Sequence, residues 1–296
     1  MSEKGLSIRA KLNLAFGADY LALTKPRLVS MVVLSALVGY LLAPSVSRAP
    51  LAAIAAVLAT TFVAAGAMVL NQFLERDIDS KMLRTQSRPI PSGRLEPVQA
   101  FVFGLIISAI GFLLYLLWVN PTSLFFSFLT WASYLFVYTP LKRWTSLSTI
   151  VGAVPGALPP VIGWMAAGGP VGIQPLILFL IIFFWQVPHF LAIAWIYRDD
   201  YERARLPVLS VVDREGAIVA RQMILNMCAL MPVSLLPTLF GLTGVVYFFG
   251  AFALGLCFSS VIIYSASDLE SRARFVLRAS IVYLAALLLL MVIDRI

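Results

Sequence analysis

A short charged stretch follows a long apolar run early in the chain. It reads NQFLERDIDSKMLRTQSRP, residues 71–89. Asn71, Glu75 and Asp79 recur every fourth residue, and on a helix each step of four advances about 40° past a full turn. The three side chains therefore share one face about 12 Å long. A carboxamide and two carboxylates on one face suit a hard cation such as Mg²⁺, which prefers oxygen ligands and shares them with phosphates.

Basic residues come directly after these acids. Lys81, Arg84 and Arg88 lie in the following loop, whereas Asp77 points to another side of an ideal helix. The planar fork of arginine matches phosphate oxygens. Acids that hold a metal beside bases that hold phosphate predict a diphosphate site. The alternative is a solvated loop whose acids and bases neutralise each other.

A second charged group ends the sixth apolar run. Its residues are Tyr197, Arg198, Asp199, Asp200, Tyr201, Arg203 and Arg205. We predict that these carboxylates form the other side of a two-sided metal clamp. A solvated charged loop is again the alternative.

The single histidine, His189, lies inside the sixth apolar run, directly after Pro188. Ionisable groups within a membrane segment are functional candidates by default. A neutral imidazole can hydrogen-bond a substrate or approach an iron. The alternative is a histidine bonded to a neighbouring helix, with Pro188 kinking the span.

The composition defines the scaffold that must position these groups. The chain has 296 residues, of which 61% are hydrophobic and 12% charged, with a mean hydropathy of +0.94. Soluble domains are about half apolar and a quarter charged, so we predict an all-α polytopic membrane protein and exclude a soluble helical core. A single transmembrane domain, residues 28–293, follows a leader, residues 1–27. Nine spans around a central cavity are predicted at about 28–45, 51–73, 98–118, 122–140, 148–167, 175–197, 220–240, 244–265 and 276–293.

The distribution of charge orients these spans. If the leader is cytoplasmic, all of the 22 lysines and arginines except Arg48 and Arg295 fall on the cytoplasmic side. The positive-inside rule therefore predicts a cytoplasmic N-terminus and an external C-terminus. The leader lacks the pattern of a cleavable signal. The net charge of +8 indicates attraction to anionic lipid headgroups and ligands, and no motif for nucleic-acid binding is present.

The acids indicate an internal repeat. Nine of the 14 aspartates and glutamates lie in two loops, 74–97 and 198–218, which follow spans two and six. This pattern predicts two diverged halves, 28–141 and 148–265, with a ninth helix added. The two acidic loops would then face each other across an axis along the membrane normal.

Two further features are interpreted as packing. Cys228 and Cys257 lie in apolar runs and are predicted to be small buried hydrophobes, neither a disulfide nor a metal pair. The fifth span is predicted to be a kinked packing seam rather than a ligand contact, because it carries Gly152, Gly156, Gly163, Pro155, Pro159 and Pro160.

Taken together, these segments resemble a known family. The segment 71–93 resembles the first Asp-rich motif of UbiA-type intramembrane prenyltransferases, N-x-x-x-D-x-x-x-D followed by R-T and R-P. Five further segments resemble one branch of that family, the protoheme IX farnesyltransferases. They are LTKPRL (23–28), YTPLKRWT (138–145), GAVPGALPPVIGW (152–164), VPHF (187–190) and YRDDY (197–201). Two departures from the wider family are Glu75, where Asp is usual, and the tyrosines at 197 and 201, where many relatives have D-x-x-x-D.

The resemblance implies transfer of a farnesyl group from farnesyl diphosphate to the 2-vinyl group of protoheme IX, with addition of water. Mg²⁺, or Mn²⁺ as the alternative, would assist the departure of the diphosphate. The implied metal-binding residues are Asn71, Glu75, Asp79, Asp199 and Asp200, with Asp200 preferred over Asp199 in the second loop. The implied diphosphate-binding residues are Lys25, Arg27, Lys81, Arg84, Arg88, Lys142 and Arg143. In addition, Tyr197 and Tyr201 would steady a cation or orient the water, and His189 would contact the heme.

The same resemblance implies a mechanism and a location. Metal and bases stabilise the charge that develops on the diphosphate, the vinyl carbon attacks the allylic cation, and the tail lies in an apolar groove between helices. The protein would lie in the bacterial cytoplasmic membrane with its site facing the cytoplasm. A downstream heme A synthase or a heme-copper oxidase assembly is the candidate partner.

Three other interpretations stay open at this point. The first is the same chemistry on a quinone or chlorophyll-type acceptor, which the PHF and YRDDY segments disfavour. The second is an ion-coupled transporter, although transport carboxylates belong near the middle of the membrane and these spans carry almost none. The third is a non-catalytic assembly factor for a heme oxidase.

Overall fold

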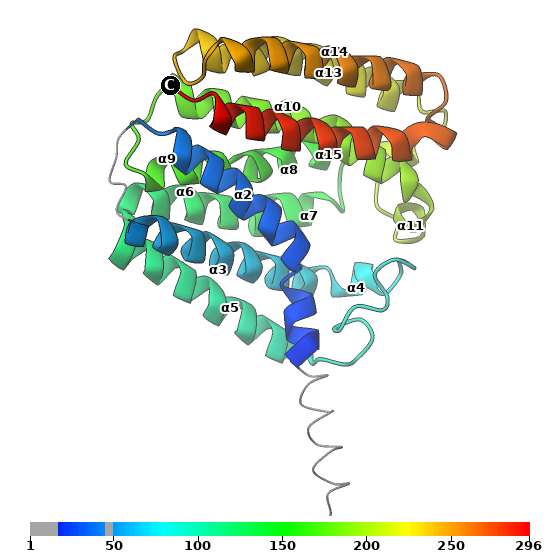
Figure 1. Ribbon diagram of the computed structural model, residues 1–296. Helices are drawn as coiled ribbons and strands as arrows, with labels where there is room; N and C mark the ends of the chain where they lie inside the picture. Colours follow the sequence, from blue (N-terminus) through cyan, green and yellow to red (C-terminus); the bar gives the residue numbers. More distant parts are fainter. Residues whose placement is uncertain (1–16, 45–49) are drawn as a thin grey trace, which may run out of the picture.

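A computed structural model describes residues 17–44 and 50–296. Within these residues the chain is helical, with no strand beyond one isolated bridge between Thr243 and Arg295. The helices stack into one bundle (Figure 1). The predicted all-α class is confirmed.

Eight of the described helical spans are long and apolar enough to cross a membrane. The segment Gly17–Leu23 and helix α2 (Pro26–Leu42) are bent by 48° from each other and make a ninth span if counted as one. The other spans are α3 (Pro50–Leu74), α5 (Pro97–Leu114) with η1 (Tyr115–Val119), α6 (Pro121–Ala132) with η2 (Ser133–Tyr138) and α7 (Thr139–Leu141), α8 (Ser148–Ala157) with α9 (Pro159–Ala166), α10 (Ile173–Ile196), α13 (Ala217–Leu239), α14 (Val245–Ala266) and α15 (Leu269–Ile293). Every predicted span overlaps one of these, and the last begins earlier than the predicted residue 276.

Prolines set several helix starts. Proline occupies the first turn of α2, α5, α6 and α9, where its fixed φ suits a helix and its missing N–H is not needed. Before α2 the chain bends at Lys25, whose φ of 49° is left-handed, a conformation that residues other than glycine rarely adopt. This bend places Lys25 outside both helical segments.

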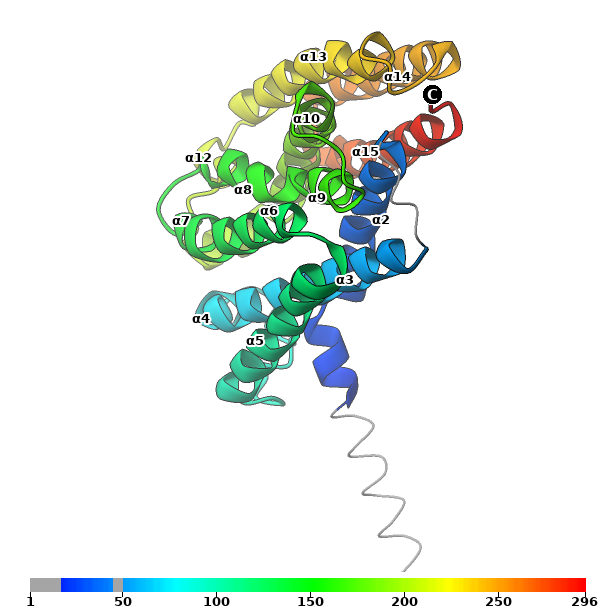
Figure 2. The same ribbon diagram turned by 90° about the vertical axis from the view of Figure 1, so that its left-hand side faces the viewer.

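Small residues let the helices approach closely, as predicted for the fifth span. A Cβ added at Gly163 would meet the carbonyl of Ala36, and one at Gly39 would meet the carbonyl of Pro160. The backbones of α2 and α9 therefore touch at two levels. Figure 2 shows α2 passing between α3 and α15. The close contact between α2 and α9 therefore fixes the position of a central helix.

The prediction that both cysteines are buried is wrong. Cys228 on α13 and Cys257 on α14 are exposed on the outer faces of their helices. These helices are apolar on all sides, as membrane helices are, so hydrophobicity alone did not distinguish the face toward the bundle from the face toward lipid.

The short elements gather where the site lies. Helix α4 (Arg76–Asp79) follows α3, and α11 (Arg198–Arg203) with α12 (Leu209–Val212) follows α10. Figure 1 shows α4 and α11 toward one end of the bundle and the C-terminus at the other. The two acidic loops are therefore on the same side of the molecule.

Candidate active site

The first predicted face is buried. Asn71, Glu75 and Asp79 are 2%, 6% and 1% exposed, whereas the side chain of Asp77 is 74% exposed. Helix α3 carries Asn71 on its last turns, and Glu75 stands at the junction with α4. A solvated loop would leave all these acids in water, so that alternative does not describe this face. Buried carboxylates require charged partners or ligands.

Each buried carboxylate has a cation from a different part of the chain. Lys142, just after α7, donates a hydrogen bond to Glu75 over 2.9 Å, and Arg88 donates to Asp79 over 2.6 Å. Burial alone would raise the pKa of Glu75, but the charge and hydrogen bond of Lys142, together with Lys25 and Asn71, outweigh it and lower that pKa. Burial alone would likewise lower the pKa of Lys142, but Glu75 together with the nearby tyrosines Tyr138 and Tyr134 holds it well above its usual value.

Lys25 adds a third cation to this cluster from the bend before α2. Burial, together with the nearby charge of Arg88, lowers the pKa of Lys25 to about 7. The chain is held there by Gln72, whose side-chain amide donates to the carbonyl of Leu23 over 2.6 Å. Positive charges crowded in this way favour an anion between them.

Three residues of this cluster were not among the predicted site residues. Thr139 accepts a hydrogen bond from the Asn71 amide over 3.1 Å. The Lys142 ammonium lies 4.6 Å from the centre of the Tyr138 ring, and Tyr134 stacks on Tyr138 with centroids 5.4 Å apart. For the two tyrosines, the sequence feature that could have indicated this role is their spacing of four residues from each other and from Lys142, which places all three side chains on one helix face.

The two acidic loops meet as predicted. Asp200, 8% exposed, accepts hydrogen bonds from the backbone amides of Leu83 over 3.0 Å and Arg84 over 3.2 Å. The Arg84 guanidinium lies 4.6 Å from the centre of the Tyr197 ring. The side chain of Asp199 is 78% exposed.

The metal clamp across both loops stays a prediction, and the acids of the two loops take separate positions in the structure. Among the described residues, no three His, Cys, Asp or Glu side chains come together as a group that could hold a metal. The physical reason is that Asp199 points outward and Asp200 is bonded to backbone amides.

The remaining predicted bases have varied surroundings. Lys81 and Arg27 are exposed. Arg143 donates to the carbonyl of Leu74 over 3.0 Å, where a cation complements the C-terminal end of α3. Tyr201 is half-buried against a small apolar cluster between the loops.

The donor set of the first face fits Mg²⁺. In phosphate-processing proteins this ion is commonly held by one or two carboxylates, with substrate phosphates and water completing its shell. Glu75 and Asp79 provide two carboxylates and Asn71 a carboxamide. Such a site needs no third acidic residue.

His189 is bonded to a neighbouring helix. Its Nδ1 lies 2.8 Å from the hydroxyl of Ser280 on α15. The Trp185 ring stacks on the imidazole, with centroids 4.8 Å apart. This arrangement matches the packing interpretation of His189 and leaves Nε2 as the nitrogen that can face a substrate.

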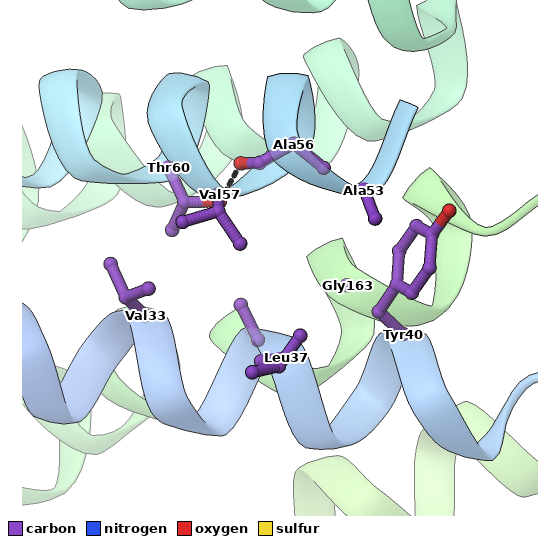
Figure 3. A pocket seen from close by; sticks show the side chains of 9 residues that line it. Val33, Leu37, Tyr40, Ala53, Ala56, Val57, Thr60 and Gly163 are labelled. Carbon is purple, nitrogen blue, oxygen red and sulfur yellow. Dashed lines mark hydrogen bonds between the residues drawn. The ribbon is translucent and has the colours of Figure 1, made fainter. Parts of the chain in front are cut away.

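A narrow crevice and a larger cavity lie outside this cluster. Figure 3 shows an apolar crevice between α2 and α3, with Val33, Leu37 and Tyr40 on one side and Thr60 opposite. Its volume of about 10 Å³ is room for about one water molecule. A larger cavity of about 420 Å³ lies where α10, α13 and α15 meet their loops and is lined by both acids and bases.

An all-α bundle of membrane-spanning helices with acids and bases buried together at one end defines an integral membrane protein with a site for an anionic ligand. This chain belongs to the UbiA prenyltransferase family, which residues 32–289 match. The predicted resemblance is confirmed.

Relatives support the same assignment, and solved structures share the fold. The chain is 44% identical over 288 residues to a protoheme IX farnesyltransferase of Solibacter usitatus, covering 94% of this chain and 98% of the relative. It is 47% identical to one of Opitutus terrae, covering 94% and 95%. A digeranylgeranylglyceryl phosphate synthase structure matches with a TM-score of 0.78 at 17% identity, covering 95% and 98%. A UbiA homolog from Archaeoglobus fulgidus bound to GPP and Mg²⁺ matches with a TM-score of 0.68 at 15% identity, covering 90% and 99%.

Proposed function

We propose that this enzyme transfers the farnesyl group of farnesyl diphosphate to the 2-vinyl group of protoheme IX with addition of water, giving heme O. The observation that carries the chemistry is the buried face of Asn71, Glu75 and Asp79 with its paired cations. The choice of substrates is supported by the names of relatives above 40% identity. The GPP and Mg²⁺ in a structural neighbour support a prenyl diphosphate as donor.

In this proposal Asn71, Glu75 and Asp79 hold Mg²⁺, and ligand hardness favours Mg²⁺ over Mn²⁺. When bound, the ion neutralises charge that develops on the diphosphate as the C–O bond breaks. Lys142 and Arg88 turn from the carboxylates to the phosphate oxygens. This exchange of partners leaves no buried charge unpaired, which is the condition for keeping ions in a low-dielectric site.

The other predicted bases surround this site in the proposal. Lys25 lies inside the cluster and binds the diphosphate directly, and Arg84 approaches from the first loop. The exposed or edge positions of Arg27, Lys81 and Arg143 suit attraction of the anionic head toward the membrane surface.

Aromatic side chains stabilise the carbocations that form during the reaction in this proposal. The stacked rings of Tyr134 and Tyr138 lie beside Lys142, where electron-rich faces can steady an allylic cation next to the departing diphosphate. Tyr197 and Tyr201 stand on the second loop and orient the water that captures the final cation. His189 contacts the heme through Nε2.

Orientation and context complete the proposal. The bias of lysine and arginine supports nine spans with a cytoplasmic N-terminus, an external C-terminus and a site that faces the cytoplasm. The protein then lies in a bacterial cytoplasmic membrane as one domain of two diverged halves with a ninth helix. Heme O is passed to a heme A synthase or to a heme-copper oxidase assembly.

An assay in detergent tests this function. The purified protein is mixed with protoheme, farnesyl diphosphate and Mg²⁺, and the heme product is read by mass spectrometry, with Asp79→Ala as the control. A heme that gains farnesyl plus one water, only with metal and only with the wild-type protein, is the expected result. If the folded enzyme leaves the heme unchanged, protoheme is not the acceptor. Prenylation of a quinone added in place of protoheme would then identify the acceptor as a quinone.

A further inference from the structure

Asp200 joins the two loops that carry the charged clusters. One carboxylate oxygen accepts from the backbone amide of Leu83 over 3.0 Å and from the Arg203 guanidinium over 2.8 Å. The other accepts from the backbone amide of Arg84 over 3.2 Å. Two successive backbone amides that converge on one carboxylate form an anion-binding nest. The first loop therefore binds an anion supplied by the second loop of the same chain.

Apolar contacts join the same loops independently of this carboxylate. Ile78 and Met82 of the first loop pack with Leu206 and Val208 of the second, in a small cluster separate from the membrane core. The Arg84 guanidinium lies over the Tyr197 ring. Because polar, apolar and cation–π contacts all cross the same boundary, the two loops form one folded unit.

The segment that Asp200 holds lies between two residues of the proposed site. Asp79 precedes it and Arg88 follows it, and these two are ion-paired over 2.6 Å. The hydroxyl of Thr85, next to the held amides, donates to the carbonyl of Asp79 over 2.8 Å. A shift of residues 83–84 would move both members of the pair.

We propose that Asp200 is a positioning residue that fixes the first loop, and that it acts on the diphosphate site through the backbone of Leu83 and Arg84 rather than as a metal ligand. This inference rests on the proposed function for the identity of the diphosphate. Charge-assisted bonds to backbone amides are about twice as strong as neutral ones, so the loop conformation depends on the negative charge of Asp200.

Hydrogen exchange on the ligand-free protein tests the positioning directly. In Asp200→Asn the amide group replaces one acceptor with a donor that faces another donor. We expect the amides of residues 83 and 84 to exchange at least about tenfold faster, while the transmembrane helices keep their protection. Asp199→Asn is the matched control, because Asp199 is the exposed neighbour, and it should leave exchange unchanged. Unchanged exchange in Asp200→Asn overturns the proposal.

Metal dependence separates positioning from ligation. The Mg²⁺ concentration for half-maximal binding of inorganic diphosphate is measured for the wild type, Asp200→Asn, Asp200→Glu and Asp79→Asn. We expect Asp79→Asn to raise this half-maximal Mg²⁺ concentration about tenfold or more. Asp200→Asn should leave it within about twofold at saturating diphosphate while weakening diphosphate binding, and Asp200→Glu should restore part of that binding. A rise in Asp200→Asn equal to that of Asp79→Asn overturns the proposal. Neither readout uses heme, so failure of the proposed acceptor would not be mistaken for failure of this role.

Discussion

The ammonium nitrogen of Lys142 lies 2.9 Å from a carboxylate oxygen of Glu75, and this ion pair joins the end of the fourth span to the end of the second. The side chains are 22% and 8% exposed. A pair this buried differs from a surface salt bridge, because removing one partner leaves the other charge without compensation.

Loss of Lys142 should therefore destabilise the protein more than loss of the whole pair. We expect Lys142→Met to lower the free energy of unfolding by about 3 kcal/mol, and the double variant with Glu75→Gln to recover much of that loss. Thermal unfolding in detergent measures the cycle, with Lys81→Met as an exposed control. Strictly additive losses would show that the two side chains are not coupled.

The same pair predicts how stability depends on pH. The pKa of Glu75 is below its usual 4.5, so its contribution is present above pH 4.5 and is lost as pH falls through the lower, folded-state pKa. The pKa of Lys142 is above its usual 10.5, so its contribution is present below pH 10.5 and is lost as pH rises through the folded-state pKa. Unfolding measured against pH should show a smaller acid-side loss in Glu75→Gln than in the wild type.

Lys25 should make diphosphate binding pH-dependent. Its pKa of about 7 means that it loses its charge as pH rises from 7 toward 9, and an anion then binds only with uptake of a proton. We expect the Kd for diphosphate to rise by up to about tenfold per pH unit in that window. Lys25→Arg, which stays charged, should lose this contribution and keep only the pH dependence of diphosphate itself. A wild-type profile equal to that of Lys25→Arg would contradict the shifted pKa.

The contact between α2 and α9 should tolerate no side chain. A Cβ at Gly163 meets the backbone carbonyl of Ala36, and backbone cannot yield as a flexible side chain does. We expect Gly163→Ala to lower the free energy of unfolding by about 1–3 kcal/mol. Gly172→Ala, where nothing lies within 4 Å, is the control. Equal melting temperatures for the two variants would mean that the helices separate easily.

Ser280 should set the state of His189. Its hydroxyl donates to the carbonyl of Leu277 over 2.7 Å, so it accepts from Nδ1–H of His189 and leaves a lone pair on Nε2. We expect Ser280→Ala to weaken protoheme binding about tenfold and to alter the heme absorption spectrum. The control is Ser265→Ala, which removes a buried hydroxyl with no hydrogen-bond partner among the described residues. Wild-type binding and spectrum in Ser280→Ala would remove His189 from the heme site.

The sequence alone was sufficient for the features that depend on local geometry. The apolar runs predicted the spans because a helix must cross about 30 Å of hydrocarbon. The spacing of four placed Asn71, Glu75 and Asp79 on one face and Asp77 off it, because 3.6 residues per turn apply wherever the chain is helical. The small residues of the fifth span predicted its close packing, because they let helix backbones approach each other.

Tertiary structure decided everything that joins distant segments. Asp200 and Leu83 are 117 residues apart, and no local pattern shows that this carboxylate meets backbone amides rather than a metal. The pairing of Lys142 with Glu75 and the outward direction of Cys228 were likewise hidden. Membrane helices are apolar on every face, so the sequence does not show which face turns inward. That choice follows from how all the helices pack together, because packing energy belongs to pairs of surfaces rather than to single residues.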